Sequence, residues 1–169
     1  AFTVLFGLAG SGLAGDDVGV IAGSANLPTF LFAWCDGTIA VAVRTVVGAG
    51  LRAAAQQSRT LYNLTSAIPG LKTVCPSNGY DAKGLLLAAI RDDDPVVFCE
   101  PKSLLFSMSE VPEGDYTVPI GKANVVREGS DVTLVTYGGS LGKCLAAAAT
   151  FEEEHGLAAE VVDLRTLRP

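Results

Sequence analysis

Apolar positions follow two different patterns in the central part of the chain: short continuous runs and helical spacing. Leu71–Cys75 and Val96–Cys99 are short apolar runs of the length typical of buried strands. Between them, residues 80–91 carry apolar side chains at helical spacing: Ala82, Leu85, Leu86, Ala89 and Ile90. Turn residues separate the three segments. Residues 68–101 therefore predict a strand–helix–strand unit with parallel strands and a right-handed crossover.

The two ends of the predicted helix differ in chemistry. Ser77 or Asn78 is available as the N-cap. Asp92, Asp93 and Asp94 follow the other end, where unpaired carbonyls already make the field negative. Two interpretations stay open on the residues alone: a solvated acidic turn, or a hard cation held by the last carbonyls and a carboxylate.

The same two patterns recur on both sides of this unit. Three further apolar runs predict buried strands: Ile39–Val43, Asp131–Tyr137 and Glu160–Leu164. Two stretches have helical periodicity: residues 51–67 and 141–154. Gly156 is a plausible residue to end the second helix, and Pro101–Ser130 predicts an extended connector without sustained period. We predict an α/β fold with a doubly wound, mostly parallel sheet.

Composition narrows the class of protein. Apolar residues make up 49% of the chain and charged residues 18%, with a mean hydropathy of +0.39, which indicates a globular chain with a large core. The net charge of −6 argues against nucleic acid or an anionic membrane as partner. No stretch reaches the roughly eighteen apolar residues that a membrane span needs. The four cysteines form no CxxC pair and predict buried, reduced thiols: Cys35, Cys75, Cys99 and Cys144.

Candidate catalytic chemistry is sparse. His155 is the sole histidine and lies at the charged end of a predicted helix, so we expect a solvated capping residue. Neither a nucleophile–base–acid set nor a Cys/His metal spacing can be built around it. We therefore expect a subunit that completes a site formed mostly by a partner.

A glycine motif offers an alternative. Gly10, Gly12 and Gly15 satisfy GxGxxG, which would indicate an NAD(P)-binding oxidoreductase. Two acids follow directly, which is the wrong sign for a pyrophosphate, and residues 16–23 have only a weak helical pattern. We expect this motif to be a coincidental match.

Three long runs carry a resemblance to a known family. They are PGLKTVCPSNGYDAKGLLLAAIRDDDPVVFCEPK, EVPEGDYTVPIGKANVVREGSDVTLVTYG and AEVVDLRTLRP. Together they resemble the beta subunit of the thiamine-diphosphate-dependent first component of pyruvate, branched-chain and acetoin dehydrogenase complexes. The resemblance covers roughly Ile39–Pro169. It implies a transketolase-like pyrimidine-binding domain at 1–118, with 1–38 divergent or shortened, and then an incomplete transketolase C-terminal domain at 119–169, in a fragment of a longer subunit.

The resemblance also implies partners and cofactors. Two alpha and two beta subunits would form a heterotetramer, in which the beta subunit supplies the pyrimidine half of the thiamine diphosphate site. The alpha subunit would bind the diphosphate through magnesium, and a lipoyl acyltransferase component would receive the acyl group. The implied location is the bacterial cytoplasm, or the mitochondrial matrix in a eukaryote.

Only some of the family's site residues have a matching residue in this sequence. The glutamate that contacts the cofactor would precede Ala1, and Gln57 stands where the family has a histidine. Glutamine hydrogen-bonds but does not shuttle protons, so Gln57 is either a weakened functional residue or a packing residue. The aromatic contact to the pyrimidine would be Phe30 or Phe32. A second hypothesis is therefore a catalytically degenerate fragment or paralogue that serves only as an assembly module.

A potassium site transfers better. In the family, its ligands are mainly backbone carbonyls, and they correspond here to Val41, Ala89, Ile90, Asp92 and Asp94. The resemblance therefore favours the bound cation over the solvated turn at the acidic end of the central helix.

Overall fold

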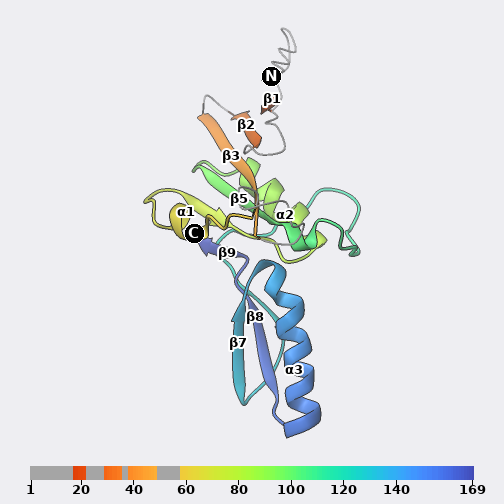
Figure 1. The fold of residues 1–169 in the computed structure, drawn as a ribbon. Helices are drawn as coiled ribbons and strands as arrows, with labels where there is room; N and C mark the ends of the chain where they lie inside the picture. The colour runs from red at the N-terminus through yellow and green to blue at the C-terminus, as the bar shows by residue number, and fades with distance from the viewer. Residues whose placement is uncertain (1–16, 22–28, 36–37, 49–57) are drawn as a thin grey trace.

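Two β-sheets joined by a returning strand form the described part of the chain (Figure 1). The computed structural model describes residues 17–21, 29–35, 38–48 and 58–169, and before residue 41 it describes the backbone alone. The larger sheet has the order β1-β2-β3-β5-β4-β9, and the smaller one the order β6-β8-β7. The strands of the two sheets are Asp17–Ile21 (β1), Thr29–Cys35 (β2), Thr38–Val47 (β3), Lys72–Val74 (β4), Val96–Pro101 (β5), Asn124–Arg127 (β6), Val132–Thr136 (β7), Ala159–Asp163 (β8) and Thr166–Arg168 (β9). The α-helices are Tyr62–Ser66 (α1), Gly79–Ile90 (α2) and Leu141–His155 (α3).

The central crossover unit is confirmed. β4 and β5 are parallel, with Lys72 opposite Val96 and Val74 opposite Phe98, and α2 connects them. Asn78 is the N-cap of α2, because its side-chain oxygen accepts a hydrogen bond from the backbone N–H of Asp81 at 2.8 Å. The unit therefore forms where the periodicity and the capping residue predicted it.

α2 buries one face of the strands β3, β5 and β4. Leu85 and Ala89 of α2 pack with Val74 and Phe98 of the sheet, and Val118 of the following connector completes this core. The connector reaches the helix because Gly84 has no side chain: a Cβ there would lie 2.5 Å from the Val118 side chain. The backbone N–H of Val118 donates to the Gly84 carbonyl at 3.0 Å.

The opposite face of the same strands is also buried. Val47, Cys75, Val97 and Cys99 form its core, against which Tyr62 and other partly buried residues pack. Burial on both faces explains why these strands are almost continuously apolar.

The α/β class is confirmed, but the larger sheet is mixed, not mostly parallel. Among the described strands of the larger sheet, β3 with β5 and β5 with β4 are the parallel pairs. β1 with β2, β2 with β3, and β4 with β9 are antiparallel. Residues 17–21, where the sequence has a weak helical pattern, form strand β1. Short connections between consecutive strands permit only antiparallel pairing, which accounts for this edge of the sheet.

The helix predicted over residues 51–67 is wrong over residues 58–61. Residues 49–57 lie outside the described part, and α1 begins only at Tyr62. The carbonyl of Arg59 accepts a hydrogen bond from the backbone N–H of Gly48 at 3.0 Å. The Arg59 carbonyl therefore bonds to the residue after β3 and not to an N–H group further along a helix.

The connector predicted over Pro101–Ser130 contains a strand. β6 pairs antiparallel with β8, with Asn124 opposite Asp163. α3 packs on one face of the small sheet through Leu141 and Ala148, which cluster with Ala159 and Val161. Gly156 ends α3 in a left-handed conformation with φ of 66°, as predicted.

The strand that follows β8 leaves the small sheet. β9 pairs antiparallel with β4 in the larger sheet, where the chain ends beside α1 (Figure 1). β9 follows the small sheet in the sequence but forms the edge strand of the larger sheet, and so it links the two sheets. In the described residues, no helix is long and apolar enough to cross a bilayer.

Candidate functional site

The carboxyl ends of β3, β5 and β4 form the edge of the larger sheet where ligands of α/β proteins are usually bound. Arg44 near the end of β3 and Glu100 near the end of β5 meet there. Glu100 Oε1 accepts from Arg44 Nη2 at 2.5 Å and from Arg44 Nε at 3.1 Å. The pair is half-buried, so it fixes the ends of two neighbouring strands relative to each other.

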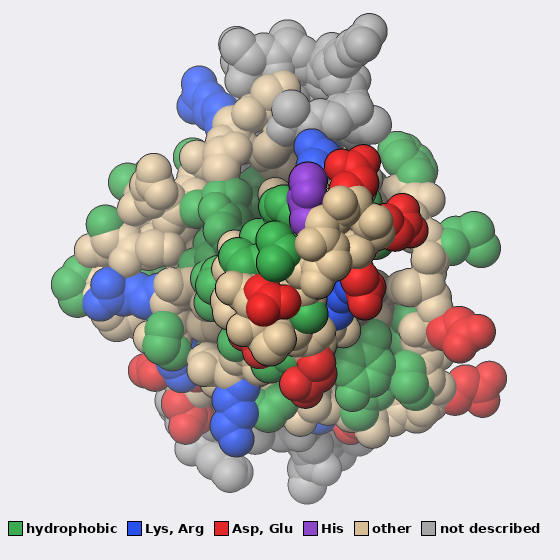
Figure 2. Space-filling view, turned by 90° about the horizontal axis from the view of Figure 1, so that it is seen from below, with side chains coloured by type: hydrophobic (Ala, Val, Ile, Leu, Met, Phe, Trp, Pro, Cys, Tyr) green, Lys and Arg blue, Asp and Glu red, His purple; other side chains and the backbone are tan. Residues whose placement is uncertain are grey.

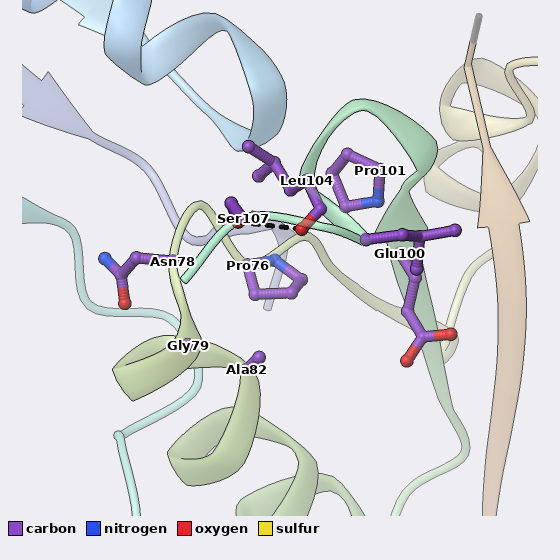
Figure 3. Close-up of a pocket in the computed structure, with 9 residues that line it drawn as sticks. Pro76, Asn78, Gly79, Ala82, Glu100, Pro101, Leu104 and Ser107 are labelled. Atoms are coloured by element: carbon purple, nitrogen blue, oxygen red, sulfur yellow. Dashed lines mark hydrogen bonds between the residues drawn. The ribbon is translucent and has the colours of Figure 1, made fainter. Parts of the chain in front are cut away.

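A pocket of about 120 Å³ lies at this edge, between the N-terminus of α2 and the residues after β5 (Figure 3). Pro76, Ala82, Pro101 and Leu104 make its walls mostly apolar, and Asn78 stands at its rim. The Glu100 carboxylate points away from the pocket, toward β3. The pocket therefore suits an apolar group better than a charged one.

A buried ionic cluster joins the pocket to the small sheet. Arg165, in the link between β8 and β9, places Nη2 2.7 Å from Oδ1 of Asp81 in α2, and the Asp81 side chain is fully buried. Asp81 Oδ2 accepts from the side-chain amide of Asn78 at 3.0 Å, so the cluster reaches the rim of the pocket. The Arg165 carbonyl also accepts from the backbone N–H of Cys75 at 2.8 Å.

Asp163 adds a second carboxyl group to this cluster. It is fully buried, and burial raises its pKa, with a smaller contribution of the same sign from Asp81. The nearby Arg165, through its backbone N–H and its charge, acts in the opposite direction. The Arg165 guanidinium pairs with Asp81, and its charge also favours ionised Asp163, so the charge balance of the cluster depends on Arg165.

The residues predicted to hold potassium lie near one another at the opposite edge of the larger sheet. Val41 precedes Ala42, which is opposite Val96, and Val96 comes two residues after Asp94. Ala89 and Ile90 belong to the last turn of α2. These residues thus occupy a single region around the end of the helix.

Lys72 is a charged residue that the sequence analysis missed in this region. Its Nζ lies 2.7 and 2.9 Å from the two carboxylate oxygens of Asp92, and 3.1 Å from Asp94 Oδ2. The hydrogen bond to Asp92 raises the pKa of Lys72, against the effect of burial. The signal was present in the sequence, because a lysine that begins β4 and an acid that follows α2 reach the same edge of the sheet.

Other predicted site residues fall where no side chain is described. Gln57 and the glycine motif of Gly10, Gly12 and Gly15 lie outside the described residues. Phe30 and Phe32 belong to β2, opposite Val43 and Val41 of β3.

Among the residues whose side chains the structure describes, the remaining reactive groups do not form a nucleophilic site. Burial raises the pKa of Cys75 to about 11 and that of Cys99 to about 12, so both are thiols near neutral pH. Tyr62, which contacts Cys75 Sγ at 3.5 Å, also has its pKa raised, chiefly by burial. His155 is exposed at the end of α3 (Figure 2). In the described residues, no group of three or more His, Cys, Asp or Glu side chains could hold a metal ion.

Two family models match the chain. Residues 31–107 match the pyrimidine binding domain of transketolase, and residues 121–169 match the transketolase C-terminal domain. The chain is therefore a transketolase-like protein with one domain of each kind. Relatives of this chain include subunits named acetoin:2,6-dichlorophenolindophenol oxidoreductase subunit beta, pyruvate dehydrogenase E1 component subunit beta and 2-oxoisovalerate dehydrogenase subunit beta.

The relatives are longer than this chain. Identity is 59% over 129 residues with the acetoin:2,6-dichlorophenolindophenol oxidoreductase subunit beta of Cupriavidus necator, which covers 76% of this chain and 38% of that protein. It is 47% over 133 residues with the pyruvate dehydrogenase E1 component subunit beta of Bacillus subtilis, covering 78% of this chain and 41% of that protein. The chain thus spans about two fifths of the length of these relatives.

Solved structures agree on the fold. A split-gene transketolase, described as an inactive beta4 tetramer, superposes with a TM-score of 0.63 at 27% identity, over 79% of this chain and 42% of that chain. The transketolase of Campylobacter jejuni gives a TM-score of 0.56 at 22% identity, over 73% of this chain and 20% of that chain.

Proposed function

We propose that this chain is the beta-subunit component of a thiamine-diphosphate-dependent dehydrogenase that acts on acetoin or a 2-oxo acid. An alpha subunit would complete the cofactor site and bind the diphosphate through magnesium, and a lipoyl acyltransferase component would take the acyl group. The observation that carries the proposal is the 59% identity with the beta subunit of an acetoin oxidoreductase. When bound, thiamine diphosphate supplies the electron sink for cleavage next to a carbonyl group.

The described residues would contribute by shaping the cofactor edge. The Arg44–Glu100 pair holds the ends of β3 and β5 together at 2.5 Å, next to the segment that leads to Gln57. Glu100 is committed to Arg44, so it is not the free carboxylate that an aminopyrimidine ring would need. The described part of this edge therefore fits a supporting role, and Gln57, Phe30 and Phe32 are the proposed contacts to the cofactor.

Turnover by the assembled complex tests the proposal. The chain would be co-expressed with the alpha subunit from the same organism, and dichlorophenolindophenol reduction would be followed with acetoin, pyruvate and a branched-chain 2-oxo acid. We expect turnover with at least one substrate and none from the chain alone. A stable complex without turnover on any substrate would favour the second hypothesis, in which the chain is only an assembly module. That hypothesis is motivated by the glutamine at position 57, where the family has a histidine.

A substitution separates the two hypotheses further. If position 57 faces the cofactor, Gln57→His should raise turnover by about 100-fold or more, because it restores a proton-transferring group. Gln56→His is the matched control next to it and should leave turnover unchanged. Equal effects of the two substitutions would show that position 57 has no special role.

We also propose a potassium ion at the end of α2, bound mainly by main-chain carbonyls of Val41, Ala89, Ile90, Asp92 and Asp94. The last carbonyls of a helix lack intrahelical partners, which makes them available as ligands. The carboxylates of Asp92 and Asp94 are committed to the Lys72 ammonium. We expect potassium to raise the unfolding temperature more than sodium at equal ionic strength, and equal effects of the two salts would refute the site.

A further inference from the structure

A short link joins the small sheet to the larger one. It consists of Leu164 and Arg165, between β8 and β9 (Figure 1). The backbone N–H of Leu164 donates to the Thr136 carbonyl of β7 at 2.8 Å, and the Arg165 carbonyl accepts from the backbone N–H of Cys75 at 2.8 Å. The link is therefore bonded to both sheets. We call its contact with the end of β4 and the N-terminus of α2 the junction.

The small sheet covers the Cys75 thiol at the junction. Gly138 begins the short 3-10 turn Gly138–Ser140 that precedes α3, and a Cβ at Gly138 would lie 2.8 Å from Cys75 Sγ. Cys75 is fully buried. The second buried thiol, Cys99, lies on β5, which has a neighbouring strand on each side in the larger sheet. Separation of the small sheet would therefore uncover Cys75 before Cys99.

Two buried carboxyl groups and one guanidinium lie inside the junction. Asp163 ends β8, Asp81 lies in the first turn of α2, and both are fully buried. Among the described residues, Arg165 forms its ion pair with Asp81, at 2.7 Å. Asp163 Oδ1 instead accepts from the backbone N–H of Arg165 at 3.2 Å. With both carboxyl groups ionised, the junction would therefore hold one buried negative charge without an ion-pair partner.

The groups that face Asp163 come from three neighbouring segments. Burial is the main cause that raises the pKa of Asp163, and the charge of Asp81 in α2 adds to it. The Ser77 hydroxyl after β4 and Arg165 in the link act in the opposite direction, without cancelling the effect of burial. The Cys75 thiol also faces this carboxyl group; burial and, more weakly, the charge of Asp163 raise its pKa to about 11. Cys75 is therefore neutral when Asp163 titrates.

The arrangement combines a covered thiol, a link bonded to both sheets and an unbalanced pair of carboxyl groups. We propose that the junction is a proton-operated latch, which is closed while Asp163 carries a proton and opens when Asp163 ionises beside Asp81. On opening, the link leaves the ends of β4 and α2, and Gly138 moves away from Cys75. The open form is a minor species, as is usual for local opening of a folded protein.

The direction of the pH dependence follows from proton binding. Asp163 has its raised pKa in the closed form and an ordinary carboxyl pKa in the open, solvated form. The closed form therefore holds the proton more tightly, and rising pH favours opening. This effect begins at the ordinary carboxyl pKa and ends at the raised value. Each unit of difference between the two pKa values increases the opening constant about tenfold.

The test measures the reaction of Cys75 and Cys99 with a pyridyl disulfide, from about pH 4 to about pH 8, across the window that an ordinary and a raised carboxyl pKa define. Peptide mass mapping gives both rates in the same full-length chain. Their ratio removes the pH dependence of the reagent and of global unfolding, because both thiols are buried. We expect the rate of Cys75 relative to Cys99 to rise about tenfold for each unit of pKa difference and then to level off.

Three variants assign the effect to Asp163. Asp163→Asn stays neutral and should hold the ratio at its low, acid value at every pH. Asp81→Asn removes the like charge and leaves Arg165 to pair with Asp163, so the ratio should depend much less on pH. It keeps the test valid if Asp163→Asn does not fold. Asp115→Asn is the control: this carboxyl group is 63% exposed, and its removal should leave the dependence of the parent chain unchanged.

Three results would overturn the latch. The first is a ratio that is independent of pH in the parent chain. The second is a parallel rise of both rates with a constant ratio, because that would show unfolding of the whole chain and not local opening. The third is a dependence on pH that persists in both Asp163→Asn and Asp81→Asn, because it would then arise from other groups.

Discussion

Arg165 is the residue on which we expect the connection between the two sheets to depend most. Its guanidinium pairs with Asp81 at 2.7 Å, and the two side chains are 14% and 0% exposed. Replacement of Arg165 by methionine keeps most of the side-chain volume but removes the charge. Asp81 would then be buried without a partner, next to the buried carboxyl group of Asp163.

The size of the effect follows from two independent estimates. Two unit charges about 4 Å apart interact with about 4 kcal/mol at an effective dielectric constant of about 20. Removal of one partner of a buried ion pair typically costs about 3–5 kcal/mol. We therefore expect Arg165→Met to lower the free energy of unfolding by about 3–5 kcal/mol, a large fraction of the roughly 5–15 kcal/mol that stabilises a typical protein.

Urea denaturation followed by circular dichroism measures this loss near neutral pH. Arg91→Met is the control, because Arg91 pairs with Asp115 at the same 2.7 Å but both side chains are more than half exposed. We expect it to cost less than about 1 kcal/mol. The double variant Asp81→Asn with Arg165→Met should cost less than the sum of its single variants. Equal, small effects of Arg165→Met and Arg91→Met would refute the buried pair.

Three further predictions concern packing and protonation. Gly84→Ala should lower the free energy of unfolding in urea by about 1–3 kcal/mol, because the added methyl group overlaps the connector; Gly142→Ala, in open space on α3, should raise it by about 0.5–1 kcal/mol. The raised pKa of Asp163 means that the native state holds its proton more tightly than the unfolded state, so stability should fall as pH rises from the ordinary carboxyl pKa to the raised value. Asp163→Asn should flatten that part of the dependence of stability on pH. An unchanged dependence would contradict the raised pKa of Asp163. Cys75 and Cys99, with pKa values of about 11 and about 12, should resist iodoacetamide in the native protein near neutral pH, whereas rapid alkylation found by peptide mass mapping would contradict their burial.

Local periodicity predicted the elements with strong internal signals. The β4–α2–β5 unit, β7, α3 and β8 appear close to their expected bounds, whereas β3 was predicted as Ile39–Val43 and runs to Val47. Each combines an apolar run or helical period with a clear boundary, such as Asn78 before α2 or Gly156 after α3. Local sequence is informative here because the same residues both form the element and bury its face.

Elements that depend on distant partners were missed. β6 and β9 are short, and each exists because a strand far along the chain, β8 or β4, offers an open edge. β2 was also missed, although its connection to β3 contained a signal: Cys35 pairs with Thr38, and Asp-Gly is a strong hairpin dipeptide.

The Arg44–Glu100 pair, the pocket and the Arg165–Asp81 pair were not predicted from the sequence, which instead pointed to the acidic residues after α2. The acids after α2 stand out in the sequence, but their partner, Lys72, lies about twenty residues earlier and becomes a neighbour only through the parallel crossover. Arg165 and Asp81 are likewise far apart in sequence and meet only when the small sheet folds against the large one. No local pattern encodes such pairs.

Binding of thiamine diphosphate to the chain, to the alpha subunit and to their mixture tests the central claim most directly. Isothermal titration calorimetry with magnesium present would measure all three. The account predicts tight binding by the mixture and much weaker binding by either polypeptide alone, because each supplies one half of the pocket. Unchanged binding by the alpha subunit when the chain is added would contradict it.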